Sequence, residues 1–389
     1  MDYTTDVAEL SDMDDDGVKS LFEALSQVPD YRHKRGRRYE AAIVLTLLIL
    51  GKLAGERTVS GIAHWARLRQ AWLTEVLGLT QVPCANTYHY VCEHLDVVEL
   101  NAVVQQWFAA HRAGEMSDGL KHWALDGKML RGSHRRTPTP VAGQEVLNVY
   151  DVDTGCLQHC AMIESKGYEA AAAQDYIGQT DCAGVVVTAD ALHTRPRFAR
   201  RIRRQHGHYV LLVKGNRAQL EAEIRQLFAL PPDPSAPVQT HTTVDIGHGR
   251  QTTRTVSTST ELNLALNDEW RDVAQVFLIE RYGTRQGKSV YESVCGVTSL
   301  TPKLASPAQL LAWVRAHWHI ENRCHWRRDV TLGEDACIVR HPRVATVLAV
   351  LNSLILALFD LHNVANARVA IRTFAAFPEQ ALALLTQPL

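Results

Sequence analysis

The order of the apolar segments between residues 121 and 228 constrains the fold more than any other feature of this sequence. There are five runs of strand-forming residues. Helical stretches at 169–177 and 195–205 separate the third run from the fourth and the fourth from the fifth, and a further stretch at 218–228 follows the fifth. The five runs are KHWALD, EVLNVYDVD, LQHCAMIES, GVVVTAD and HYVLLVK. Three strands followed by alternating helices and strands predict an α/β domain. The turn residues Asp153, Thr154 and Gly155 predict a hairpin between the second strand and the third.

The flanking regions have other residue patterns. Residues 1–16 form an acidic tail, and 17–112 carry apolar residues at three- and four-residue spacing, which predicts an all-helical N-terminal domain. Residues 231–302 are polar and β-branched, which predicts a β-rich insertion. We therefore expect the catalytic core to consist of 120–230 and 303–389, the latter including the C-terminal helices.

The charge distribution indicates a nucleic-acid partner. The net charge of −1 argues against a generic polyanion binder, but the acidic tail masks a basic remainder. The run RHKRGRR and the segment 58–77, which resembles a helix-turn-helix unit, make the helical domain a candidate for DNA binding. Solvated surfaces and an ordinary helix pair are the alternative interpretations.

The sequence favours a cytoplasmic, nucleoid-associated protein without a membrane partner. It has eight cysteines without a CxxC pair and begins without a secretory signal. The apolar stretch 41–50 ends before Lys52, well short of the roughly 20 residues that cross a bilayer.

Three acidic residues are candidates for metal chemistry. Asp126 and Asp190 each follow an apolar strand, and Glu321 lies in a helical stretch dense in His, Trp and Arg. Carboxylate oxygens are the ligands that Mg²⁺ or Mn²⁺ prefers, and two such ions are expected. The alternative is structural, since an Asp at a strand end is often a turn residue or a helix N-cap. Gly127 is interpreted as leaving room for a phosphate or a metal-bound water.

Several basic side chains near these acids are candidates for contacts with DNA phosphates. They are Lys128, Arg131, His193, Lys214, Arg250, His325 and Arg328. A zinc site made of His317, His319, Cys324 and His325 is disfavoured, because four ligands within nine helical residues point around the whole helix.

Taken together, the strings VPDYRHKRGRRY, LDGKMLRGS, VVVTADALHT, YVLLVKGN, GHGRQTTR and VRAHWHIENRCHWRRDVTLGEDA resemble the DDE transposases of bacterial insertion sequences, in the H-repeat-associated branch. The element order also matches the ribonuclease-H-like core. The resemblance implies the catalytic triad Asp126, Asp190 and Glu321. It further implies cleavage at terminal inverted repeats, transfer of the 3′-hydroxyls to target DNA, and a homodimer on double-stranded DNA.

The sequence departs from the hairpin-forming transposases at three positions around the glutamate. Val314, His317 and Arg328 stand where that group has tyrosine, arginine and lysine. Whether excision passes through a DNA hairpin is therefore undecided. Two other functions are also compatible with the sequence. The first is a domesticated transposase that acts as a DNA-binding regulator, and the second is a structure-selective nuclease.

Overall fold

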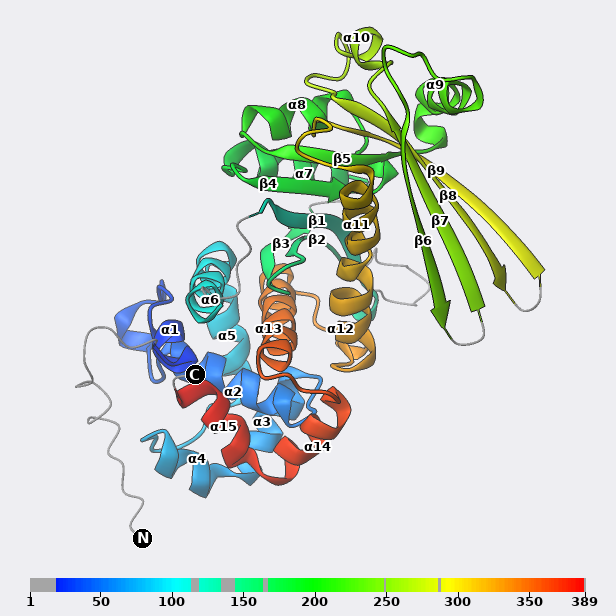
Figure 1. Ribbon diagram of the computed structural model, residues 1–389. Helices are drawn as coiled ribbons and strands as arrows, with labels where there is room; N and C mark the ends of the chain where they lie inside the picture. The colour runs from blue at the N-terminus through cyan, green and yellow to red at the C-terminus, as the bar shows by residue number, and fades with distance from the viewer. Residues whose placement is uncertain are drawn as a thin grey trace, which may run out of the picture.

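The computed structural model describes residues 19–112, 119–133, 144–163, 167–247, 250–285 and 288–387. The acidic tail 1–16 lies outside the described residues. A mixed sheet fills the upper part of the molecule, and a group of helices from both ends of the chain fills the lower part (Figure 1).

Five strands of the sheet form the predicted core. The first three are antiparallel neighbours, and the fourth and fifth run parallel to the first. These strands are β1 (Lys121–Leu130), β2 (Gln144–Asp151), β3 (Leu157–Ile163), β4 (Val185–Ala189) and β5 (His208–Val213). The helices that alternate with them are α7 (Glu169–Gln179), α8 (Pro196–Arg204) and α9 (Ala218–Ala229). The predicted ribonuclease-H-like order is therefore confirmed.

The β-rich segment forms strands as expected, but it extends the core sheet rather than building a separate one. The sheet order is β3-β2-β1-β4-β5-β9-β8-β7-β6, in which β9 pairs antiparallel with β5. The added elements are β6 (Gln239–Gly247), β7 (Arg250–Ser259), α10 (Asn263–Leu266), β8 (Gln275–Arg285) and β9 (Lys288–Thr298). Their long strands project beyond the core (Figure 1).

Residues 19–112 are helical, as the spacing predicts. Ser20 begins the first helix with a capping box closed by Glu23, and the most apolar helix is almost entirely buried. The helices are α1 (Leu21–Ser26), α2 (Ala41–Leu53), α3 (Val59–Leu68), α4 (Gln70–Val76), α5 (Ala85–His94) and α6 (Val97–His111). The segment 58–77 thus contains two helices, α3 and α4, and DNA docking by this pair stays a prediction.

The C-terminal helices pack against the N-terminal ones. The helices are α11 (Pro307–His317), α12 (Trp326–Val330), α13 (Pro342–Leu361), α14 (Ala367–Ala376) and α15 (Pro378–Thr386). One hydrophobic core joins α13 and α15 to α1, α2, α5 and α6. Among the described residues, α13 alone has the length and apolar composition of a membrane span, and 89% of its apolar window is buried inside the protein.

Candidate active site

The two aspartates lie side by side at one edge of the parallel strand pair. Leu125 of β1 is in register with Ala189 of β4, so Asp126 and Asp190 are the next residues on neighbouring strands. β4 ends at Ala189. β1 continues to Leu130 because β2 pairs with it from Trp123 to Leu130. Asp126 is therefore inside a strand, where sequence analysis placed a strand end. Asp190 also acts as an N-cap, the alternative role that the sequence offered, since its Oδ1 accepts a hydrogen bond of 2.9 Å from the Leu192 amide.

Glu321 reaches the same edge from a helix with an irregular turn. The residues around Glu321 are helical as expected, but the chain forms a π-helical segment, Ile320–His325, between α11 and α12. This wider turn carries both Glu321 and His325, and π-helical turns occur frequently at functional sites. The segment contacts β1, which brings Glu321 toward Asp126.

The acids interact electrostatically. Burial raises the pKa of Asp126 to about 8, and the charges of Glu169, Glu321 and Asp190 add to this effect. The pKa of Glu321 is also raised, first by burial and then by Asp190, while Lys214 opposes the shift. The carboxylates are therefore near enough for each to disfavour the charge of another.

His325 lies between Asn148 and Asp126. The Asn148 side-chain amide, on β2, donates to His325 Nε2 over 3.1 Å. This assigns the proton of the neutral ring to Nδ1, which faces Asp126 Oδ2 at 3.5 Å. Burial, reinforced by Arg328 and Lys128, lowers the pKa of His325 well below its ordinary value and so keeps the ring neutral.

A buried ionic network lies beneath the acids. Arg328 is fully buried, and its Nη2 lies 2.9 Å from Glu334 Oε1. Lys128 Nζ lies 2.6 Å from Asp329 and 3.3 Å from Glu334. Although burial opposes it, the charges of Arg328 and Lys128 hold the pKa of Glu334 below its ordinary value. Removing one partner of such a buried pair costs about 3–5 kcal/mol.

This network changes the interpretation of three predicted DNA contacts. Arg328, Lys128 and His325 are each buried and have partners inside the protein, so none of them is presented to a DNA phosphate in this structure. The sequence did not indicate this, because the partners come from several elements: Asp126 of β1, Asn148 of β2, Asp329 of α12 and the turn at Glu334.

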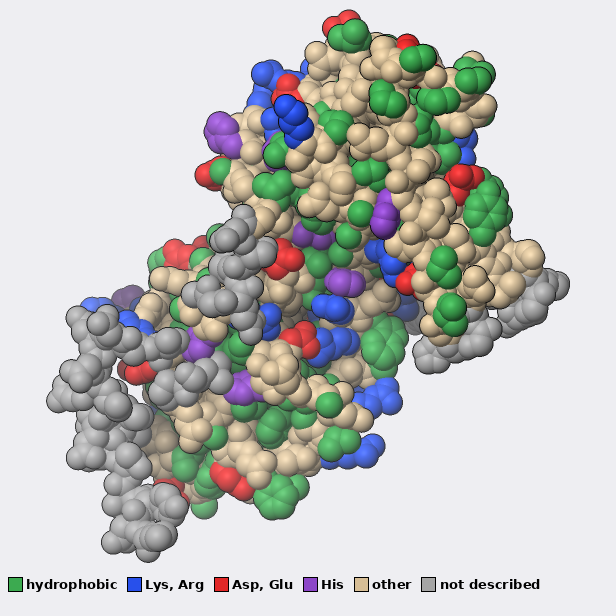
Figure 2. All heavy atoms as spheres, in the orientation of Figure 1, with side chains coloured by type: hydrophobic (Ala, Val, Ile, Leu, Met, Phe, Trp, Pro, Cys, Tyr) green, Lys and Arg blue, Asp and Glu red, His purple; other side chains and the backbone are tan. Residues whose placement is uncertain are grey.

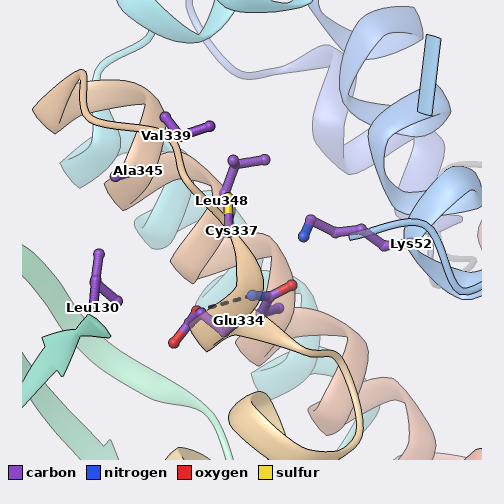
Figure 3. Close-up of a pocket in the computed structure, with 8 residues that line it drawn as sticks. Lys52, Leu130, Glu334, Cys337, Val339, Ala345 and Leu348 are labelled. Carbon is purple, nitrogen blue, oxygen red and sulfur yellow. Dashed lines mark hydrogen bonds between the residues drawn. The ribbon is translucent and has the colours of Figure 1, made fainter. Parts of the chain in front are cut away.

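The network adjoins a cavity at the boundary between sheet and helices. Figure 3 shows Lys52 of α2 directed toward Glu334 and Cys337 across this space. The cavity has a volume of about 20 Å³, which is the space of about one water. Burial lowers the pKa of Lys52. The cavity contains none of the three acids, so it is not part of the candidate active site.

The other predicted DNA contacts include both exposed and buried side chains. Lys214, just after β5, is exposed and lies close enough to Glu321 to affect its pKa, and the Arg131 side chain is 78% exposed and lies 3.7 Å from Asp335. His193 is buried and its Nε2 lies 2.7 Å from Glu169, so it faces a carboxylate rather than the surface. The side chain of Arg250 lies outside the described residues. Figure 2 shows basic, acidic and histidine side chains gathered in the hollowed waist of the molecule.

Sequence analysis missed two residues at the site, Glu169 and Asn148. Glu169 opens α7, and a Cβ built on Gly127 would lie 2.5 Å from its Cδ. The space at Gly127 is therefore filled by this carboxyl group, whereas sequence analysis reserved it for a phosphate. A Glu at a helix start and an Asn within a strand are common, so neither residue gave a distinct signal.

The donor chemistry of the site fits a hard divalent cation. Asp126, Asp190 and Glu321 supply the carboxylate oxygens that Mg²⁺ and Mn²⁺ prefer. Burial raises the pKa of Asp126 first and the neighbouring carboxylates raise it further, and a bound cation would offset the charge of those carboxylates. In the described part of the chain, no three such side chains already stand in metal-ligand geometry. Cation binding would therefore require the carboxylates to reorient.

Comparisons with known proteins agree with this picture. The family model described as Transposase DDE domain matches residues 118–358, and one described as DDE_Tnp_1-associated matches residues 22–108. The chain is 24% identical over 335 residues to "Putative transposase YncI" of Escherichia coli O157:H7, which covers 85% of each protein. It is 22% identical over 336 residues to "H repeat-associated putative transposase YhhI" of Escherichia coli K12, covering 85% of this chain and 88% of that protein.

Two further similarities are to an uncharacterized protein and to a solved structure. An uncharacterized protein from the dhlA 3′ region of Xanthobacter autotrophicus is 27% identical over 288 residues, covering 73% of this chain and 94% of that protein. Among solved structures, a piggyBac transposase synaptic complex with hairpin DNA aligns with a TM-score of 0.43 and 11% identity, covering 93% of this chain and 79% of that chain.

Proposed function

Because the chain belongs to the Transposase DDE domain family, we propose that it binds the terminal inverted repeats of an insertion sequence, cleaves there, and joins the 3′-hydroxyls to target DNA. Family membership implies a phosphoryl-transfer enzyme, and DDE enzymes generally use divalent metals. The observation that carries the proposal is the meeting of Asp126, Asp190 and Glu321 at one edge of the sheet.

The three acids would hold two Mg²⁺, with Asp126 contacting both, Asp190 one and Glu321 the other. When bound, the ions activate the attacking oxygen and stabilise the leaving oxygen of a phosphodiester. His325 contributes by holding Asp126 with its Nδ1 proton, and Asn148 fixes the ring. Because these residues come from β1, β2 and the π-helical segment, the sheet and helix fix the backbone that carries them, while the carboxylates themselves would reorient to hold a cation.

The test is strand cleavage of the native element ends with Mg²⁺. We expect Asp126→Asn to abolish cleavage while the affinity for the ends changes little, because the substitution keeps the shape of the side chain and removes the charge that holds the cation. Asp175→Asn, at a surface site on α7 that is 73% exposed, is the matched control and should cleave normally. Cleavage by Asp126→Asn at the wild-type rate would refute the proposal.

Exposed cations beside the acids are proposed to bind phosphates. Lys214→Gln should weaken end binding and reduce the slope of log affinity against log salt by about 1, since one phosphate contact releases about one counterion. A fluorescence-anisotropy titration at several salt concentrations measures this. An unchanged slope would remove Lys214 from the DNA interface.

Two transposon ends must be held together for strand transfer, so we propose a homodimer on DNA that acts in the cytoplasm at the nucleoid. Light scattering of the protein with end DNA should give the mass of two chains and two DNA duplexes. One chain for each duplex at saturating protein would contradict the dimer.

A further inference from the structure

A fourth carboxylate, that of Glu169, lies at the candidate active site. A Cβ built on Gly127, the residue after Asp126, would lie 2.5 Å from the Cδ of Glu169 and 2.6 Å from its Oε2. The carboxyl group thus rests on the β1 backbone directly beside Asp126. Any larger residue at position 127 would displace it.

His193 holds this carboxyl group in place. Its Nε2 lies 2.7 Å from Glu169 Oε1, and its ring is fully enclosed and packs beside Phe198 at a centroid distance of 5.8 Å. His193 ends the short turn that Asp190 begins. One partly buried hydrogen bond therefore ties the start of α7 to the loop that carries the second aspartate.

The other oxygen of Glu169 is uncommitted. In the described part of the chain, Oε1 takes the hydrogen bond from His193, whereas Oε2, the atom over Gly127, takes none. Of the acids near Asp126, Glu169 has the largest effect on its pKa. Four carboxylates without a facing cation repel one another, and a bound divalent ion would reverse that penalty.

We propose that Glu169 is a fourth carboxylate ligand of the divalent-cation site, together with Asp126, Asp190 and Glu321, and that His193 is the residue that positions it. This inference rests on the proposed function of the three acids. The contacts that carry it are the closeness of Glu169 to the Gly127 backbone and its hydrogen bond to His193.

The experiment measures binding of Mn²⁺ alone to the full chain by isothermal titration calorimetry, without DNA. Glu169→Gln keeps the size of the side chain and an oxygen that can accept from His193, but it removes the charge. We expect its Mn²⁺ affinity to fall at least about tenfold, the lower end of the range for supporting groups at metal sites. Asp175→Asn, a charge removal farther along α7, should bind as the wild type does.

His193 is tested through the same readout. His193→Gln should weaken Mn²⁺ binding in the wild-type background and have no further effect in Glu169→Gln, because it acts only through that carboxylate. Equal losses in both backgrounds would assign His193 a general structural role and overturn its positioning role. Gly127→Ala, which would displace the carboxyl group, is the second route if Glu169→Gln does not fold, and it should weaken Mn²⁺ binding likewise.

Asp126→Asn separates this inference from the function on which it rests. If Asp126→Asn loses Mn²⁺ affinity and Glu169→Gln keeps it, Glu169 is a structural partner of His193 only and the inference fails alone. If Asp126→Asn and the wild type bind Mn²⁺ equally, the metal site of the proposed function fails as well.

Discussion

At Asp126 one partly buried side chain experiences the charges of three other carboxylates. Its pKa of about 8 lies far above the ordinary value of 3.8, first because of burial and then because of these charges, so the folded state disfavours the ionised carboxylate more than the unfolded chain does. Residues arranged for binding are often unfavourable for stability in this way. The same acids that make the site suitable for a cation therefore make it unstable without one.

This has a consequence for the stability of the protein in EDTA. Between pH 3.8 and about 8 the folded state binds a proton at Asp126 that the unfolded state has released. The contribution of Asp126 to the free energy of unfolding is therefore fully present below pH 3.8. It is lost as the pH rises from 3.8 through about 8, by at most about 1.4 kcal/mol per pH unit. Asp126→Asn should lack this loss, so its urea midpoint should exceed that of the wild type increasingly from pH 5 to pH 8.

Urea unfolding at several pH values, with and without Mn²⁺, measures the effect. Addition of Mn²⁺ should stabilise the wild type more than the variant and so reduce or reverse the difference. If the urea midpoints of the two proteins in EDTA changed equally with pH, the raised pKa of Asp126 would not be affecting stability.

At the scale of elements, the junction of core and insertion is a packed part of the sheet. Gly296 of β9 lies opposite Phe277 of β8, and the ring of Phe277 covers the glycine. A Cβ on Gly296 would lie 2.0 Å from the Phe277 Cζ atom. The ring of Phe277 therefore occupies the space that a side chain at position 296 would need, in the strand β9 that also pairs with β5 of the core.

Gly296→Ala should destabilise the protein by about 1–3 kcal/mol, the usual cost of adding volume to a packed core. Gly247→Ala at the end of β6 is the control, because no atom of the described residues lies within 4 Å of its added Cβ. Thermal unfolding followed by circular dichroism compares the two. Similar melting temperatures for both variants would mean that the β8 and β9 pair is loosely packed.

At the scale of the whole molecule, the two ends of the chain build one helical unit. α13 contacts α2, α5 and α6, while α15 contacts α1 and α2. These contacts belong to a single hydrophobic core that also includes one face of β1, β2 and β3. The helical region 17–112 accordingly depends on residues more than 200 positions later in the sequence.

A fragment of residues 17–112 should therefore not fold cooperatively by itself, because the apolar surface that α13 and α15 cover would face water. Circular dichroism during heating and limited proteolysis measure this, with the intact chain as the control. A sharp melting transition of the fragment would show instead that 17–112 is an independent domain.

The sequence by itself determined the order of elements and the candidate acids. Strand alternation and helical spacing are local properties, so the core strands, their helices and the N-terminal helices could be predicted. Asp126, Asp190 and Glu321 were found in the same way, from their settings in short motifs and from resemblance to a known family. Their assignment as catalytic ligands stays a prediction until metal binding and cleavage are measured.

Only the tertiary structure decided which charged side chains face solvent and which face each other. Arg328 and Lys128 look like surface cations in the sequence, but Glu334 and Asp329 pair with them in the interior. Glu169 gave no local signal and became part of the site because α7 begins over Gly127. Electrostatic partners are chosen by distances between segments far apart in the chain, and neither composition nor periodicity contains those distances.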